Sequence, residues 1–168
     1  DDLRGAVDGW DFKSYVLGTM FYRYISENLA AFLNQGEIEA GNLDFRYENL
    51  TDEEAQLSEE EYKDIIKTRG FFIRPSELFC NVRAKAASDE NLNETLETVF
   101  RHIEESAKGS SSEGQFAGLF DDYDVNSNKL GATVAKRNEK LVKLLNGVAD
   151  MNLGDVKEHD IDAFGDAY

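Results

Sequence analysis

The chain has 168 residues, 41% of them hydrophobic and 11% aromatic, which is enough for the core of one domain and excludes a disordered coil. Its 34 acidic residues against 18 Lys and Arg give a formal net charge of −16, which excludes a protein held on nucleic acid or on an anionic membrane by bulk charge. No apolar run approaches the length of a membrane span, and the single proline leaves long stretches free to form helices.

The first predicted element is a long helix over about residues 11–34, because apolar side chains recur there at three- and four-residue spacing. We expect Gly36 to end this helix. Residues 37–50 show no sustained period and are expected to form a loop. The side chains of the helical stripe are Leu17, Met20, Phe21, Tyr24, Ile25, Asn28, Leu29 and Phe32.

Two capping-box motifs follow, at residues 51–54 and 58–61. In each of them a Thr or Ser side chain and a Glu three residues later can satisfy the free amides at the start of a helix. The motifs predict short helices over 51–56 and 58–68, and Gly70 is expected to end the second helix.

The middle of the chain predicts a short extended run and two further helices. Residues 71–73 form the extended run, and Pro75 suits the first turn of a helix that continues to about Ala84. The helix predicted over 91–108 has the clearest apolar face, on which we expect Phe100 to be a core residue. That face consists of Leu92, Leu96, Val99, Phe100, Ile103 and Ala107.

The last third of the chain predicts a loop, two short segments and one more helix. Residues 109–112 read as a flexible loop and 116–120 as a short apolar segment, which an Asp- and Asn-rich turn follows. A helix is expected over about 133–146, with Gly147 as its left-handed stop. The predicted fold class is therefore mainly α, a helical bundle-like domain with at most one short strand or hairpin.

The residues suggest no catalytic or metal site. His102 and His159 lie in different predicted elements, and neither has a Cys or His at ligand spacing. Cys80 is the only cysteine, so an internal disulfide is excluded and a reducing, cytoplasmic compartment is favoured; we expect this residue to be buried and structural. Gly114 and Gly118 lack the tight spacing that brings a backbone against phosphates.

The segment 121–128 imitates a calcium loop, because oxygen-bearing side chains occupy alternate positions. A calcium loop also needs Gly at its sixth position and a bidentate Glu at its twelfth. In the register that starts at Asp122 those positions hold Ser127 and Thr133, and the register that starts at Asp124 fails at both as well. We therefore expect a polar turn with Asx-type hydrogen bonds and no bound metal.

One basic feature stands out against the acidic background, in the helix predicted over 133–146. Lys136, Lys140 and Lys143 lie within about 60° of one another on a helical wheel. The opposite face is expected to carry Val134, Leu141, Leu145 and Val148. Two interpretations stay open: a solvated face of an amphipathic helix, or a patch that contacts DNA phosphates or an acidic partner.

Five segments, spread over nearly the whole chain, point together to one family. They are LRGAVDGWDFKSYVLGTMFYRYIS at 3–26, GFFIRPSELFCNV at 70–82, LFDDYDVNSNKLG at 119–131, RNEKLVKLLNGVADM at 137–151 and IDAFGDAY at 161–168. In this order they resemble the N-terminal region of the modification (methyltransferase) subunit of type I restriction-modification enzymes.

The resemblance implies a complete subunit that methylates adenine in DNA with S-adenosylmethionine, and a helical N-terminal domain followed by a Rossmann-like catalytic domain. Its implied partners are a specificity subunit, a second modification subunit, a restriction subunit and double-stranded DNA held by the assembly. The N-terminal domain is expected to help close the complex on DNA and to sense its methylation state. Residues 1–150 would be that domain, and 151–168 a linker to a catalytic domain outside this sequence.

No family catalytic or cofactor-binding residue can be carried over to this chain. The family's Asn-Pro-Pro-aromatic motif is absent, since the only proline, Pro75, follows Arg74. We therefore expect this chain alone to bind no cofactor. The alternative is a free-standing acidic helical protein that acts as a DNA mimic or inhibitor, which the net charge of −16 suggests. Mimicry needs carboxylates at phosphate-like spacing, whereas the acids here fall largely at caps and in loops.

Overall fold

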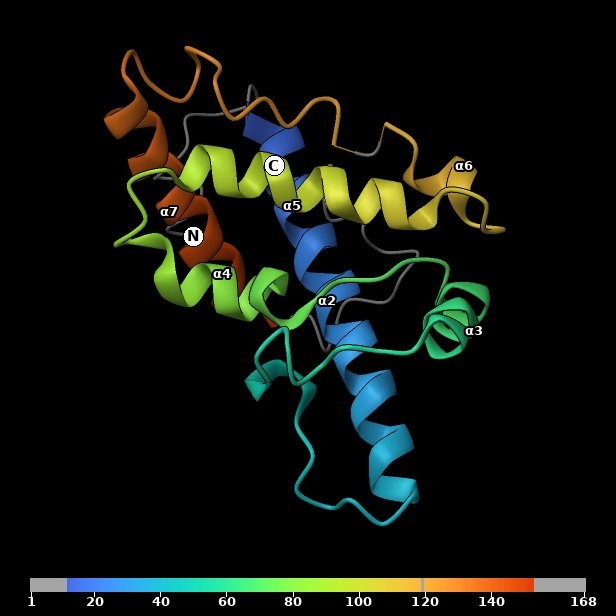
Figure 1. Ribbon diagram of the computed structural model, residues 1–168. Helices are drawn as coiled ribbons and strands as arrows, with labels where there is room; N and C mark the ends of the chain where they lie inside the picture. The colour runs from blue at the N-terminus through green and yellow to red at the C-terminus, as the bar shows by residue number, and fades with distance from the viewer. Residues whose placement is uncertain (1–11, 119, 153–168) are drawn as a thin grey trace.

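A computed structural model describes residues 12–118 and 120–152, which form helices joined by turns and loops (Figure 1). The described residues contain no β-strand, so the prediction of a mainly helical fold is confirmed. None of their helices is long and apolar enough to cross a membrane. The elements are α2 (Lys13–Glu39), η2 (Tyr47–Asn49), α3 (Glu59–Arg69), η3 (Pro75–Glu77), α4 (Phe79–Ala86), α5 (Leu92–Ala107), α6 (Glu113–Phe116) and α7 (Val134–Ala149).

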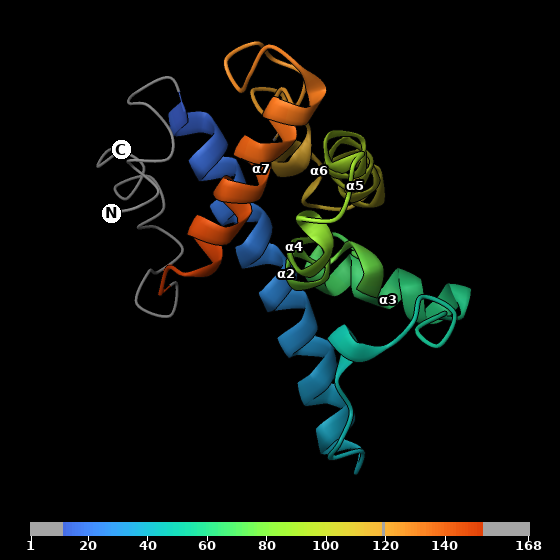
Figure 2. The ribbon, with the colours of Figure 1, turned by 90° about the vertical axis from the view of Figure 1, so that its left-hand side faces the viewer.

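Helix α2 is longer than the sequence predicts. It continues through Gly36 to Glu39, and the left-handed glycine that follows its end is Gly41, with φ at +104°. A glycine inside a helix costs about 1 kcal/mol relative to alanine, which the surrounding turns of a long helix can offset. The last turns of α2 project beyond the other helices in both views (Figures 1 and 2). The prediction that Gly36 ends this helix is wrong.

The two capping boxes have different outcomes. At Ser58 and Glu61 both reciprocal hydrogen bonds form, at 3.0 and 3.1 Å, and α3 runs from Glu59 to Arg69, where left-handed Gly70 ends it as expected. At 51–54 the same pair of bonds forms, at 2.9 and 3.0 Å, yet only a turn results. Forming the first turn of a helix is unfavourable, and only further turns make up for that cost. Too few residues remain before the next cap at Ser58 to add such turns, so no helix forms at 51–56.

The helix predicted from Pro75 to Ala84 is broken in two. Pro75 opens the short 3-10 helix η3 as a first-turn residue, but buried Leu78 is extended, with ψ at 147°, and α4 begins only after it. The Phe79 amide at the start of α4 donates to Ser26 Oγ of α2 at 3.0 Å. A side chain 53 residues away therefore caps this helix, and the local sequence could not show it.

Helix α7 also passes through its predicted stop, Gly147, and ends at Ala149. Arg23 of α2 explains the extension, because its Nη1 donates to the carbonyl oxygens of Val148 at 2.8 Å and Met151 at 2.6 Å. A cation at a helix C-terminus satisfies free carbonyls and is attracted to the negative end of the dipole. The prediction for Gly147 is wrong because this contact comes from another helix.

The core lies where α2, α4, α5 and α7 meet. Every residue of the predicted α5 stripe is buried, so the phase of that helix is confirmed. Phe100 is 4% exposed and stacks on Phe120 with ring centroids 3.9 Å apart. Tyr22 and Tyr123 meet the same ring edge-on, at 5.4 and 5.0 Å.

Candidate interaction surfaces

The three lysines singled out in the sequence lie on α7 with unequal exposure. Lys136 and Lys143 are exposed, whereas Lys140 is partly buried with its Nζ 5.6 Å from the centroid of the Phe12 ring. Such a distance allows a cation–π attraction. The helix therefore presents two solvent-facing cations, while the third also packs against the start of α2.

The opposite face of α7 is buried as predicted at Leu141, Leu145 and Val148, but not at Val134, which is 45% exposed. Val134 is the first residue of the helix, and the core begins one turn later. There the polar Asn138 is buried at 8% exposure and acts as a cap for α5: its Oδ1 accepts from the Asn93 amide, and its Nδ2 donates to the Glu90 carbonyl, both at 3.0 Å.

The calcium-like segment forms turns held by its own side chains. Asp124 Oδ1 accepts from the Asn126 amide at 3.0 Å, and Ser127 Oγ accepts from the Lys129 amide at 3.1 Å. Thr133, which stands where a calcium loop needs its bidentate Glu, caps α7 through a bond from the Lys136 amide at 3.2 Å. The predicted Asx-type hydrogen bonds are therefore present.

Millimolar calcium is expected to leave the melting temperature of the domain unchanged. The oxygens of Asp124, Ser127 and Thr133 already accept backbone hydrogen bonds, and no carboxylate stands at the twelfth position of the loop. Thermal unfolding with calcium, with magnesium as the control and with a chelator added afterwards, measures this. A rise of several degrees that only the chelator reverses would contradict the assignment.

The histidine and cysteine have environments that the sequence did not predict. His102 Nδ1 lies 2.7 Å from Glu77 Oε2, whereas His159 lies outside the described residues.

Cys80 is exposed, so the prediction that it is buried is wrong. Phe79 and Val82 occupy the buried face of α4, and Cys80 borders a small cleft beside α2. Partial burial, and then the Glu48 carboxylate, raise the pKa of its thiol, which lowers its reactivity.

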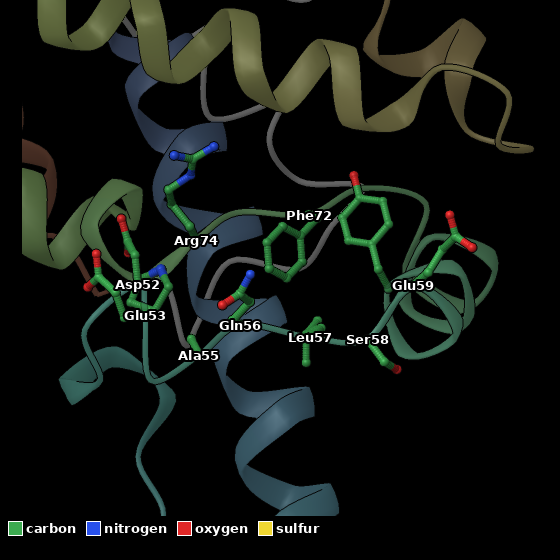
Figure 3. A pocket seen from close by; sticks show the side chains of 11 residues that line it. Asp52, Glu53, Ala55, Gln56, Leu57, Ser58, Glu59, Phe72 and Arg74 are labelled. Atoms are coloured by element: carbon green, nitrogen blue, oxygen red, sulfur yellow. The ribbon is translucent and has the colours of Figure 1, made fainter.

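A groove beside α3, which the sequence did not predict, is here called the α3 groove. It has a volume of about 640 Å³ and lies between the segment 52–59, Tyr62 of α3 and the run 72–75 (Figure 3). A neighbouring hollow of about 310 Å³ shares Tyr62, Phe72 and Arg74 and extends to His102. In the sequence, this groove could have been suspected only from the adjacent phenylalanines at 71 and 72, since two neighbouring side chains in an extended run point to opposite sides. In the structure Phe71 is buried and Phe72 is partly exposed.

Two hydrogen bonds bring the distant sides of the α3 groove together. The Asp52 carboxylate accepts from the Ser76 amide at 2.9 Å and from the Ser76 hydroxyl at 2.6 Å. In Figure 3 Asp52 and Glu53 lie at one end of the groove and Glu59 at the other, with Gln56 and Leu57 between them and Phe72 facing the cavity. The arrangement is an apolar trough with acidic ends.

Comparison with known proteins gives three concordant findings. The HsdM N-terminal domain matches residues 1–148. The chain is 47% identical over its whole length to the type I restriction enzyme MpnII methylase subunit of Mycoplasma pneumoniae, of which it covers 32%. It is also similar to the crystal structure of the type I restriction-modification system methyltransferase subunit from Streptococcus thermophilus, with 25% identity and a TM-score of 0.70 over 98% of this chain and 35% of that one.

The chain thus spans about a third of the length of these relatives. The resemblance inferred from five sequence segments is confirmed along nearly all of the chain, in sequence and in fold. The protein belongs to the HsdM N-terminal domain family, as the N-terminal domain of a type I restriction-modification methylase subunit.

Proposed function

We propose that this chain is the interaction and regulatory domain of an adenine-specific DNA methyltransferase that uses S-adenosylmethionine and works in the cytoplasm. The observation that carries the proposal is the match to the HsdM N-terminal domain over residues 1–148, together with 47% identity to a curated methylase subunit. The domain helps the complex to close on DNA and to respond to the methylation state of the target. The partners are a specificity subunit, a second modification subunit, a restriction subunit and double-stranded DNA.

The two glycines considered in the sequence as a phosphate-binding loop do not form one in the structure. Gly114 lies inside the short helix α6, and Gly118 lies in the turn after it with φ at +70°, so these two glycines do not form one binding loop. Methylation of a base also requires a pocket for the flipped adenine beside the cofactor. We propose that the rest of the subunit supplies the cofactor site and the catalytic residues.

The proposal is tested with the complete subunit and with a variant that lacks residues 1–148, each assembled with the specificity subunit. The truncated subunit is expected to bind S-adenosylmethionine in titration calorimetry, and the isolated domain is expected to show no binding. The truncated complex is expected to bind DNA more weakly and to lose its preference between unmethylated and half-methylated targets. Stoichiometric cofactor binding by the isolated domain, or unchanged DNA binding after truncation, would contradict the assignment.

Replacing Lys136, Lys140 and Lys143 with glutamine is expected to weaken DNA binding by the complete complex equally at all target sequences. Phosphate contacts add affinity without reading bases, and each contact that is lost lowers the slope of log affinity against log salt by about one. Because Lys140 also packs on Phe12, the double variant at Lys136 and Lys143 separates surface charge from packing. DNA affinities measured over a range of salt concentrations test this; an unchanged slope would show that the lysines are a solvated face.

A further inference from the structure

We propose that the α3 groove is a docking site for an extended segment of a partner subunit, which inserts an apolar side chain between flanking Lys or Arg residues. The inference rests on the proposed function, since it assumes that the domain works within a multisubunit complex. It goes further by naming the surface and the chemistry of the segment that binds there.

The floor of the α3 groove suits an apolar side chain. Tyr62 and Phe72 form an edge-to-face pair with ring centroids 5.2 Å apart, and both rings are only partly buried. Leu57 also lines the groove and is partly exposed, while the lining residues Ala55 and Pro75 are buried. Incompletely covered aromatic rings in a pocket are typical anchor points at protein interfaces. With a volume of about 640 Å³, the groove has room for several side chains.

The charges around the groove decide which class of partner fits. Arg74 is the one cation among its described lining residues, and its Nε already lies 3.6 Å from the Glu77 carboxylate. Glu53 and Glu59 at the two ends are both exposed, and the ion pair that Glu59 makes with Lys63 is a weak surface contact of 3.9 Å. The groove is therefore acidic, which attracts Lys and Arg and repels DNA phosphates.

The neighbouring hollow extends the same surface and adds acidity. It shares Tyr62, Phe72 and Arg74 with the α3 groove, and Glu105 adds an exposed carboxylate at its edge. His102 and Glu77 bind each other there at 2.7 Å, so Glu77 is engaged on two sides. A segment that leaves the α3 groove past Arg74 would again meet carboxylates.

The α3 groove lies away from the lysines of α7. Helices α3 and α7 stand at opposite sides of the domain in both ribbon views (Figures 1 and 2). One face of the domain is therefore acidic and apolar, while the other carries Lys136 and Lys143. A partner subunit on the first face would leave the second face free for DNA.

Photo-crosslinking in the assembled methyltransferase complex tests the proposal directly. The probe is p-benzoylphenylalanine in place of Gln56, an exposed residue of the groove, and the matched control carries it in place of exposed Gln115 on α6. Mass spectrometry is expected to place the Gln56 crosslink on a segment of another subunit that has Lys or Arg on both sides of an apolar residue. A crosslink to DNA or to a segment without such residues, or no crosslink, would overturn the proposal.

Charge reversal gives an independent measurement. Glu53→Lys with Glu59→Lys is expected to raise the dissociation constant for the crosslinked subunit by about tenfold or more, because two attractions become repulsions. The control is Glu94→Lys with Glu97→Lys, which makes the same change in net charge at exposed positions of α5 and is expected to have a much smaller effect. Equal effects of the two pairs, at unchanged melting temperature, would overturn the proposal.

Measurements on the unmodified complex show whether the docking site or the proposed function has failed. If it assembles and methylates DNA but the Gln56 probe and the charge reversal give the contrary results, the docking site fails and the proposed function stands. If the unmodified subunits neither assemble nor methylate DNA, the proposed function fails and the docking proposal falls with it.

Discussion

Phe100→Ala is expected to lower the free energy of unfolding by about 3–5 kcal/mol, the usual cost of removing a fully buried aromatic ring. The ring is 4% exposed, stacks on Phe120 at 3.9 Å and receives the edges of Tyr22 and Tyr123. Tyr22 belongs to α2, and Phe120 and Tyr123 belong to the turns before α7, so a cavity at Phe100 would loosen contacts that join these segments to α5. Urea unfolding monitored by circular dichroism measures the change.

The matched control for this substitution is Glu97→Ala on the same helix. Glu97 is exposed, and surface substitutions usually change stability by no more than about 0.5 kcal/mol. A cost at Phe100 below about 1 kcal/mol, or one equal to that at Glu97, would contradict the burial of Phe100 at the centre of the core.

Raising the pH above 10 is expected to destabilise the domain steeply, because three tyrosines stay protonated only while it is folded. Burial is the main cause that raises the pKa of Tyr22, Tyr47 and Tyr123 above 10.0, and the carboxylates of Glu77 and Asp52 add to it at Tyr22 and Tyr47. The Tyr22 hydroxyl donates to the Glu77 carbonyl, and the Tyr47 hydroxyl donates to the Ile73 carbonyl at 2.7 Å. The Tyr123 hydroxyl is hydrogen-bonded to Thr19 Oγ1 at 2.6 Å.

The sign of the effect follows from proton binding. Above pH 10 an unfolded tyrosine loses its proton while the buried one keeps it, so the unfolded state binds fewer protons and becomes more favourable as the pH rises. The contribution of each tyrosine is fully present below pH 10 and is lost by about 1.4 kcal/mol per pH unit until its raised native pKa is reached.

The variant Tyr47→Phe isolates one of these contributions. It is expected to be less stable than the unmodified domain at neutral pH, because the Ile73 carbonyl loses its hydrogen bond. Above pH 10 its stability should fall less steeply, by about 1.4 kcal/mol per pH unit. Urea unfolding at a series of pH values compares the two slopes, and parallel slopes would show that Tyr47 ionises as readily in the folded domain as in the unfolded chain.

The sequence predicted most reliably those elements whose signals are local. Helix α5 appeared with the right phase because its apolar residues recur at helical spacing, and α3 because Ser58, Glu61 and Gly70 mark its ends. Gly36 and Gly147 led to wrong helix ends, because a glycine inside a helix lowers stability by only about 1 kcal/mol relative to alanine. Contacts with other parts of the domain can outweigh that cost. At α7 that contact is the guanidinium of Arg23, 125 residues away from Val148.

The α3 groove could not be predicted for a related reason. Its two sides are separated in the chain and are brought together by the bonds between Asp52 and Ser76. Asp52 lies within the capping box at 51–54 but is not one of its two bonding residues, and Ser76 belongs to no recognisable motif. Hydrophobic periodicity also does not show which of two adjacent phenylalanines faces solvent. The lysines of α7, by contrast, were found from helical spacing alone, although their contact with DNA stays a prediction.

The projecting end of α2 is short, because the helix is held to the domain well beyond Arg23. Leu29 is fully buried, and Asn34 Oδ1 accepts from the Tyr47 amide at 2.7 Å. From Asn34 to Glu39 the helix runs on for about 8 Å at 1.5 Å per residue. Leu43, 67% exposed, stands just beyond that end. This leucine therefore lies apart from the core, and replacing it would leave the packing of the helices unchanged.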